Sequence, residues 1–139
     1  SREKVSLLQI LEQIRRYMLQ TLLPSARRVT IHVGGEDVIV SADCASSVAL
    51  VVNELVQNAL KYAFPSGQAG RIGIELHSGR PLCQLTVWDN GVGFQADRPR
   101  PGGAGLELAS TIVREKLTGE WSVESGPGGT RISFDFLEQ

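Results

Sequence analysis

The chain has 139 residues, of which 42% are hydrophobic and 21% are charged, and its formal net charge at pH 7 is -1. This length and composition predict one globular domain with a substantial core. A chain so close to neutrality has no strong electrostatic attraction to nucleic acid or to an anionic membrane, so neither is an expected partner.

The two cysteines, Cys44 and Cys83, lack the spacing of a metal or redox motif. We expect free, buried thiols in a reducing compartment, and therefore a cytoplasmic protein or the cytoplasmic part of a larger sensor. No apolar run reaches the roughly 18 residues that a membrane span needs, so we expect no direct membrane contact. Because the chain starts within a helical pattern, residues 1–139 are interpreted as a single domain from a longer protein.

The first half of the chain contains two helical patterns separated by two short strand patterns. Apolar residues recur every three or four positions in the helices and every second position in the strands. Glycines in the segment 34–37 predict a hairpin turn between the two strands. Ser41 and Asp43 are candidate N-terminal caps for the second helix. We expect a helix at about 6–23, strands at 29–33 and 38–40, and a helix that runs on through 51–64.

The second half combines four strand patterns with one helix. Residues 71–77 and 83–88 alternate apolar and polar side chains on either side of a turn, which indicates an antiparallel pair with one covered face. After a loop, we expect a helix at about 105–117, ended by Gly119, and strands at 121–125 and 130–136. Because helices and strands do not alternate singly, the expected fold is α+β, with helices packed on one face of a mostly antiparallel sheet.

The helix through 51–64 has an unusual polar half. Its apolar side chains fill one half of the circumference and its polar side chains fill most of the other. Glu54, Asn58 and Lys61 have i, i+4, i+7 spacing and line one edge of the polar half. A carboxylate, an amide and an ammonium in a row can serve a metal and phosphates together. Alone, the same pattern is equally typical of a solvated helix face with a Glu–Lys pair.

Three glycine-containing segments follow this helix. Asp89-Asn90-Gly91 alone is typical of a turn, and the segment 128–130 alone is typical of a hairpin tip. The segment 102–105 is either a flexible loop or an anion site. Its backbone amides can approach phosphate because glycines carry no side chain, and the start of the following helix adds positive potential.

Together and in this order, these motifs resemble the ATP-binding domain shared by sensor histidine kinases, gyrase, heat-shock chaperone and mismatch-repair ATPases, the GHKL superfamily. Residues 54–62 resemble the N box, 89–94 the G1 box, 103–106 the G2 box and 129–130 the final glycine-threonine motif. The likeness covers the chain from about Ser6 to its end. It implies the Bergerat ATP-binding fold, a two-layer α/β sandwich with helices on one face of a mixed, mostly antiparallel sheet. Within the superfamily, residues 58–64 and the short lid resemble sensor histidine kinases.

The resemblance implies ATP and Mg²⁺ as cofactors, and it assigns roles to individual residues. Asn58 is implied to bind Mg²⁺ through its side-chain oxygen, and Lys61 to contact phosphate oxygens. Asp89 is implied to accept a hydrogen bond from the adenine amino group, with support from Thr130 through water. Glu54 either acts as a base for water or orders a metal-bound water, and it joins Asn58 and Lys61 in the implied catalytic set.

Further positions are implied to shape the nucleotide site. Tyr62 either packs near the adenine ring or belongs to the core. Arg98 and Arg100 either contact the γ-phosphate or only solubilise the loop that carries them. The remaining residues of the implied nucleotide-binding set, which admit the base or receive the phosphates, are Gly91, Gly93, Gly103, Gly105 and Leu106.

The implied function is that of the catalytic domain of a sensor histidine kinase. Such a domain binds Mg-ATP and donates the γ-phosphate to a histidine on a separate dimerisation domain in two-component signal transduction, with a response regulator downstream. His32 and His77 fall within strand patterns and are expected to be ordinary strand residues, so we expect the acceptor histidine elsewhere in the parent kinase. Two alternatives stay open: a serine kinase of the anti-sigma-factor type, and a non-catalytic nucleotide-sensing interaction module.

Overall fold

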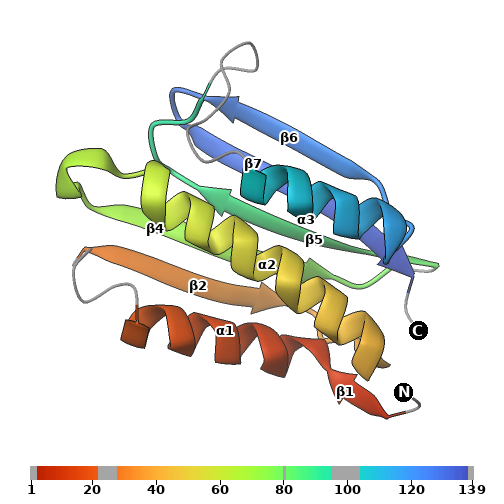
Figure 1. Cartoon of the computed structure of the whole chain (residues 1–139). Coiled ribbons are helices and arrows are strands. Elements are labelled where there is room, and N and C mark those ends of the chain that lie inside the picture. The colour runs from red at the N-terminus through yellow and green to blue at the C-terminus, as the bar shows by residue number, and fades with distance from the viewer. Residues whose placement is uncertain (1–2, 22–27, 80, 95–103, 138–139) are drawn as a thin grey trace.

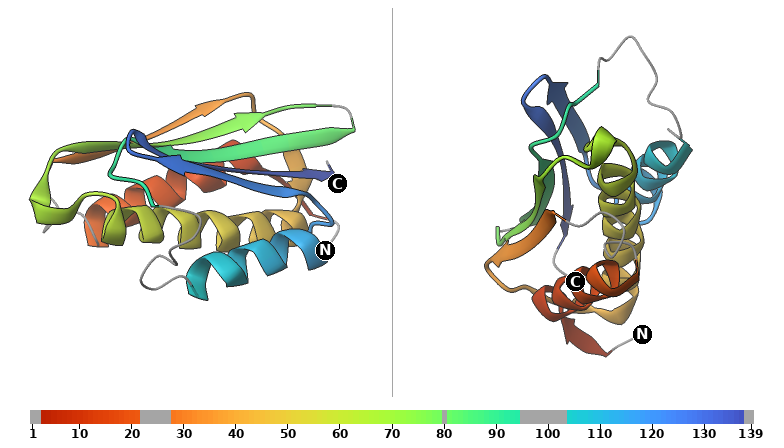
Figure 2. Two further views of the ribbon diagram at one scale, coloured as in Figure 1. Left: turned by 90° about the horizontal axis from the view of Figure 1, so that it is seen from above. Right: turned by 90° about the vertical axis from the view of Figure 1, so that its left-hand side faces the viewer.

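The computed structural model describes residues 3–21, 28–79, 81–94 and 104–137, which form two layers (Figure 1). One layer is a five-stranded sheet with strand order β2-β4-β5-β7-β6. The helices of the described part all lie on the same face of this sheet, as Figure 2 shows, so the predicted α+β architecture is confirmed. The elements are β1 (Lys4–Ser6), α1 (Leu7–Thr21), β2 (Val29–Gly35), β3 (Ile39–Ser41), α2 (Ala42–Tyr62), η2 (Pro65–Gly67), β4 (Gly70–His77), β5 (Leu82–Asp89), α3 (Ala104–Glu115), β6 (Trp121–Gly126) and β7 (Gly129–Leu137).

Strand pairing confirms one predicted pair and contradicts another. β4 and β5 are antiparallel neighbours, as are β5 and β7, and β7 and β6. The predicted hairpin of residues 29–33 with 38–40 is wrong, because β2 pairs in parallel with β4 instead. β3 forms a separate two-stranded sheet with β1, a strand that the sequence pattern did not indicate.

The segment predicted as a hairpin turn caps α1. Asp37 accepts hydrogen bonds through Oδ1 from the backbone N–H of Leu8 at 2.9 Å and through Oδ2 from Oγ of Ser6 at 2.6 Å. Ser6 in turn accepts from the N–H of Gln9 at 3.2 Å, as an N-cap residue does. Gly35 has φ +110°, and the next residue donates its N–H to Leu76 on β4 at 2.9 Å. The turn therefore joins β2 to its parallel neighbour and to α1.

Helix α2 is the central element of the helical layer. It begins as predicted, with Ser41 as N-cap, whose side chain accepts a hydrogen bond from the N–H of Cys44 at 3.1 Å. The core lies between the helices and the inner face of the sheet, where strand side chains of β4, β5 and β7 alternate inward. The buried apolar residues of α2 are Cys44, Ala45, Val48, Val51, Val52, Leu55, Val56 and Ala59.

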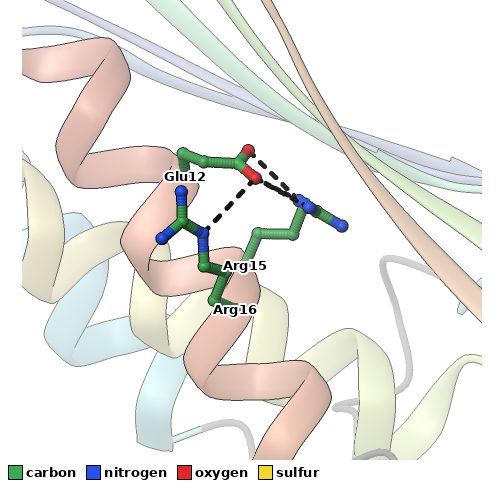
Figure 3. Close-up of polar contacts among 3 residues, drawn as sticks. All are labelled: Glu12, Arg15 and Arg16. Atoms are coloured by element: carbon green, nitrogen blue, oxygen red, sulfur yellow. Dashed lines mark hydrogen bonds and ion pairs between the residues drawn. The ribbon is translucent and has the colours of Figure 1, made fainter.

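Helix α1 carries an ion pair on its partly exposed side (Figure 3). Arg15 donates from Nη2 to Oε1 of Glu12 at 2.7 Å and from Nε at 2.9 Å, and Arg16 lies 3.9 Å from the same oxygen. The hydrogen bond from Arg15 lowers the pKa of Glu12 below its ordinary value. Ion pairs within one turn of a surface helix contribute only about 0.3–0.5 kcal/mol, so this pair is a minor part of the stability of α1.

Helix α3 ends through a different residue from the one predicted. Thr118, not Gly119, has the left-handed conformation, with φ +49°. Gly119 donates its N–H to the carbonyl of Val113 at 3.0 Å, six positions earlier, so this bond closes a wide final turn of the helix. Glycine is required at 119 for another reason, because a Cβ there would overlap the carbonyl oxygen of Asp135 on β7.

Both cysteines are buried and neither forms a disulfide, as predicted. Among the described residues, no helix has the length and apolar character needed to cross a membrane.

Candidate functional site

Hydrogen bonds of Asp89 and Asn90 hold the loop after β5 in place. Asp89, 7% exposed, accepts a hydrogen bond through Oδ1 from the backbone N–H of Gly91 at 2.9 Å. Asn90 accepts through Oδ1 from the N–H of Arg71 at 2.7 Å and donates its own N–H to the carbonyl of Arg71 at 3.2 Å. The first of these bonds orients the Asp89 carboxylate, and the other two attach the loop to β4.

The same loop is fastened to the C-terminal end of α2. Val92 donates its N–H to the carbonyl of Ala63 at 2.9 Å. Gly91 lies so close to this residue that a Cβ on Gly91 would overlap both the carbonyl oxygen and the Cβ of Ala63. The packing therefore requires glycine at position 91.

Asp89 belongs to a row of residues across neighbouring strands. It is the register partner of Thr130 on β7, and Thr130 is the register partner of Ser125 on β6. Thr130 is 4% exposed, and its Oγ1 lies 2.7 Å from Oγ of Ser125. Because Asp89 follows the buried Val87 by two positions, the row lies on the face of the sheet that the helices cover.

A second group of predicted site residues meets where α2 and α3 touch. A Cβ built on Gly105, in the first turn of α3, would lie 2.7 Å from Oε2 of Glu54 and 3.8 Å from Nδ2 of Asn58. Asn58 is only 5% exposed although it belongs to the polar half of α2, because this side of the helix faces α3. Free backbone N–H groups at a helix start favour anions, so the arrangement suits phosphate.

The two groups are separated along α2 by a short distance. Ala63 follows Asn58 by five positions, which corresponds to about 7.5 Å along the helix at 1.5 Å per residue. A ligand with a flat polar group at one end and anionic groups at the other would therefore match both groups.

The remaining predicted site residues occupy different environments. Lys61 is exposed and Tyr62 is half-buried, in the last turn of α2. Gly93 has φ +70°, a conformation that favours glycine, and a Cβ there would overlap the carbonyl oxygen of Gly126. Leu106 is partly buried and packs against the hydrophobic core. The predictions for Gly103, Arg98 and Arg100 lie outside the described residues.

A hollow of about 470 Å³ opens at the Asp89 end of the sheet. Asp89 and Thr130 belong to its lining, but so do Trp88 and Arg131, which alternate onto the opposite face of the strands. The hollow therefore extends around the strand ends, and only part of it borders the hydrogen-bonded row of Asp89 and Thr130.

Two residues of this region were missed by the sequence analysis. Ser125 contacts Thr130, and it also accepts a hydrogen bond from the N–H of Phe94 at 2.8 Å. Ala63 provides the backbone to which the Asp89 loop docks. A hairpin turn over 126–129 places Ser125 opposite Thr130. The glycines of this turn could therefore have indicated Ser125 from the sequence.

The two-layer fold is that of a known family of ATPase domains. A family model described as "Histidine kinase-, DNA gyrase B-, and HSP90-like ATPase" matches residues 44–139, well over half of the chain. The chain therefore belongs to this ATPase family, as the resemblance of its sequence motifs predicted.

Among curated relatives, the chain is 27% identical over 120 residues to the sensor histidine kinase PdtaS of Mycobacterium tuberculosis, a match that covers 84% of this chain and 24% of PdtaS. It is 28% identical over 89 residues to the serine-protein kinase RsbW of Listeria innocua, which covers 52% of this chain and 57% of RsbW. The chain thus spans about a quarter of the length of PdtaS.

A solved structure has the same fold over nearly the whole chain. The histidine kinase domain of the blue-light-activated histidine kinase EL346 of Erythrobacter litoralis superposes with a TM-score of 0.82 at 24% identity. The match covers 95% of this chain and 65% of that domain. It confirms the predicted two-layer fold.

Proposed function

We propose that this chain binds Mg-ATP and donates its γ-phosphate to a histidine on a separate dimerisation domain in two-component signalling. One observation carries the proposal: α2 positions the Asp89 loop at its C-terminal end and brings Glu54 and Asn58 to the start of α3. Membership of the ATPase family supports ATP as the ligand of this pair of sites.

Asp89 is proposed to recognise the base. The N–H of Gly91 orients one carboxylate oxygen of Asp89, in a nearly buried position. A carboxylate accepts hydrogen bonds and donates none. It therefore favours adenine, which has an amino group at its C6 position, over guanine, which has a carbonyl oxygen there. Thr130 is the register partner of Asp89 and supports the same contact, while Gly93 and Tyr62 complete the base site.

The residues at the start of α3 are proposed to hold the phosphates and the metal. Asn58 offers a hard amide oxygen, which suits Mg²⁺, and this ion keeps several waters, so a single protein ligand is sufficient. Among the described residues, no group of three His, Cys, Asp or Glu side chains could hold a metal ion by itself. Lys61, exposed in the last turn of α2, is proposed to contact phosphate oxygens, and the backbone of Gly105 is proposed to receive them.

The proposed transfer breaks the bond between the γ-phosphorus and the oxygen that bridges to the β-phosphate. A phosphorus–nitrogen bond forms to the imidazole of the acceptor, and ADP leaves. Magnesium, when bound, neutralises the charge of the phosphates. Glu54, next to Gly105, orders a water in this arrangement. The dimerisation domain, the response regulator and a cytoplasmic location belong to the proposal for the parent kinase.

The two histidines of this chain are unsuitable acceptors. His32 and His77 are exposed, and each alternates with inward-facing neighbours, Ile31 and Leu76. Both side chains therefore lie on the sheet face opposite to the helices, whereas Asn58 and Gly105 lie in the helical layer. We propose that the domain does not phosphorylate itself.

Calorimetry with ATP, ADP and GTP, with and without Mg²⁺, tests the nucleotide site. The variant Asp89→Asn keeps an oxygen for the N–H of Gly91 but places an amide donor where the adenine amino group would donate. We expect the wild type to prefer ATP over GTP, and Asp89→Asn to bind ATP at least tenfold more weakly, as loss of a hydrogen bond to a charged group predicts. Glu124→Gln removes an exposed charge on β6 and serves as the matched control. Equal binding of ATP and GTP by the wild type would contradict the proposal.

Incubation with γ-labelled ATP tests the transfer. We expect no label on the isolated chain and label on a histidine when the dimerisation domain of the parent protein is added. Mass spectrometry identifies the labelled residue. A phosphohistidine at position 32 or 77 would show that the acceptor lies within the chain.

The similarity to RsbW supports a serine acceptor as the second candidate. Acid treatment separates the two functions, because phosphohistidine is acid-labile and phosphoserine is stable. Loss of the label in acid supports the histidine kinase, and retention supports the serine kinase.

A further inference from the structure

Ser125 makes two polar contacts through one hydroxyl group. Its Oγ accepts a hydrogen bond from the backbone N–H of Phe94 at 2.8 Å and lies 2.7 Å from Oγ1 of Thr130. The side chain is half-buried near the end of β6, just before the turn that leads to β7. It therefore connects two segments of the proposed base site that are about 36 residues apart in the sequence.

The first connection joins Ser125 to Asp89 by way of Thr130. The three residues are register partners across the neighbouring strands β6, β7 and β5. A hydroxyl group has one hydrogen to donate. If Ser125 donates to Thr130, the hydrogen of Thr130 is available on the side of Asp89. If Thr130 donates to Ser125, only its oxygen lone pairs are available there. The direction of the hydrogen bond between Ser125 and Thr130 therefore decides which hydrogen-bonding group Thr130 presents beside Asp89.

The second connection fixes the backbone that follows Gly91. Gly93 lies directly against Gly126, since a Cβ on Gly93 would overlap the carbonyl oxygen of Gly126. The next residue, Phe94, donates its backbone N–H to Oγ of Ser125. Two adjacent contacts therefore attach residues 93–94 to residues 125–126.

We propose that Ser125 is a positioning residue for base recognition: through the hydroxyl of Thr130 and the backbone of Gly93–Phe94, it sets the selectivity for the 6-amino group of adenine without touching the nucleotide. This inference rests on the proposed ATP-binding function, because it assumes that Asp89 and Thr130 bind the base. It assigns Ser125 a role in selectivity as well as in packing.

The test compares ATP with purine riboside triphosphate, which lacks the 6-amino group, on the same protein. In the wild type we expect ATP to bind about tenfold more tightly or better, the effect of one hydrogen bond to a charged group. In Ser125→Ala we expect this ratio to fall by about threefold to tenfold, the range of one ordinary hydrogen bond. Ser125→Thr retains the hydroxyl and should retain the ratio.

Three further variants separate positioning from a general structural effect. Ser122→Ala is the matched control, because Ser122 is exposed on the same strand, and it should leave the ratio unchanged. Ser125→Cys keeps the size of the side chain but is a weak hydrogen-bonding partner, so it should also lower the ratio, even if Ser125→Ala does not fold. In the double variant Ser125→Ala/Thr130→Val, the two losses should be less than additive, because part of the effect of Ser125 acts through the hydroxyl of Thr130. Any loss beyond that of Thr130→Val alone measures the part that acts through the backbone of Gly93–Phe94.

The outcomes distinguish this inference from the function on which it rests. If the wild type binds neither nucleotide, the proposed function fails. If the wild type prefers ATP and both Ser125→Ala and Ser125→Cys keep the full preference, only the role of Ser125 is overturned. A parallel loss of affinity for both nucleotides, with an unchanged ratio, would assign Ser125 to packing alone.

Discussion

The carboxylate of Glu54 on α2 lies against the backbone of Gly105 on α3, where a Cβ would be 2.7 Å from Oε2. The first turn of a helix has N–H groups without partners in the helix and a positive potential. A negative side chain therefore lies next to the turn that is proposed to receive phosphate. Any side chain at position 105 must change the position of Glu54.

We expect Gly105→Ala to reduce phosphoryl transfer while the domain stays folded. The atom that the new methyl group would meet is the end of a flexible side chain, so Glu54 can move aside, and the free energy of unfolding should change by less than about 1 kcal/mol. A displaced catalytic group typically costs about a hundredfold in rate, and we expect a tenfold to hundredfold loss. Label transfer to the dimerisation domain measures the rate, and a melting curve measures stability.

Gly128→Ala is the matched control for this change, because a Cβ there has no atom within 4 Å. If Glu54 mediates the effect, the substitution Gly105→Ala should cause no further loss in a protein that already carries Glu54→Ala. A full additional loss in that background would show that the methyl group acts on something else.

Gly91→Ala should destabilise the whole domain. Its Cβ would overlap backbone and side-chain atoms of Ala63, and the backbone at the end of α2 has little freedom to move. Overpacking of this kind costs about 1–3 kcal/mol. Chemical denaturation of the variant should show this loss, whereas Gly34→Ala, whose Cβ meets no atom within 4 Å, should denature close to the wild-type midpoint.

Asp37 should make stability depend on pH in the acid range. Burial raises the pKa of Asp37, but hydrogen bonds from Ser6, Leu8 and Val38 outweigh this effect and lower it below the ordinary value. A lowered pKa in the folded state means that the stabilisation is present above about pH 3.9, the unfolded value, and is lost as pH falls through the folded value.

We expect Asp37→Ala to cost about 1 kcal/mol at pH 7, as the loss of a helix cap does, and less at pH 2. Urea denaturation at the two pH values measures the difference. An equal loss at both would mean that the charge of Asp37 contributes nothing.

Cys44 should resist alkylation in the folded protein. Burial, followed by the influence of Cys83, raises the pKa of Cys44, and the thiolate is the reactive form. After brief treatment with iodoacetamide at pH 8, intact mass should show an unmodified folded chain, and two alkylations once the chain is unfolded. Rapid modification of the native protein would indicate that the region around Cys44 opens easily.

Much of the fold was predictable because its elements are marked by local patterns. The helical and strand periods located α2, β4, β5, β6 and β7 to within a few residues. The pairing of β2 was not predictable in this way. Glycines at 34–35 are typical of a hairpin, and no local signal indicates that β2 lies parallel to β4 across the intervening α2. The hydrogen bond between Asp37 and the N–H of Leu8 was not predictable either, because the two residues are 29 positions apart in the sequence.

For the candidate site too, some features were predictable from the sequence and others appear only in the folded chain. The motifs around Asn58, Asp89 and Thr130 were recognisable in the sequence, because they occur in a fixed order. The burial of Asn58 was not, since its side of α2 is polar by pattern and is covered only when α3 packs there. The sequence motif relates Gly105 to phosphate, but the contact of Gly105 with Glu54 appears only in the folded chain.

The sequence alone therefore determined which segments are helices and strands, which of their faces are apolar, and which family of nucleotide sites the polar residues resemble. Only the tertiary structure decided which strands are neighbours, that the turn at 34–37 caps α1, and that Ser125 links Phe94 to Thr130. The physical reason is range: periodicity reflects interactions between residues close in the chain, whereas these contacts join residues brought together by burial of one shared core.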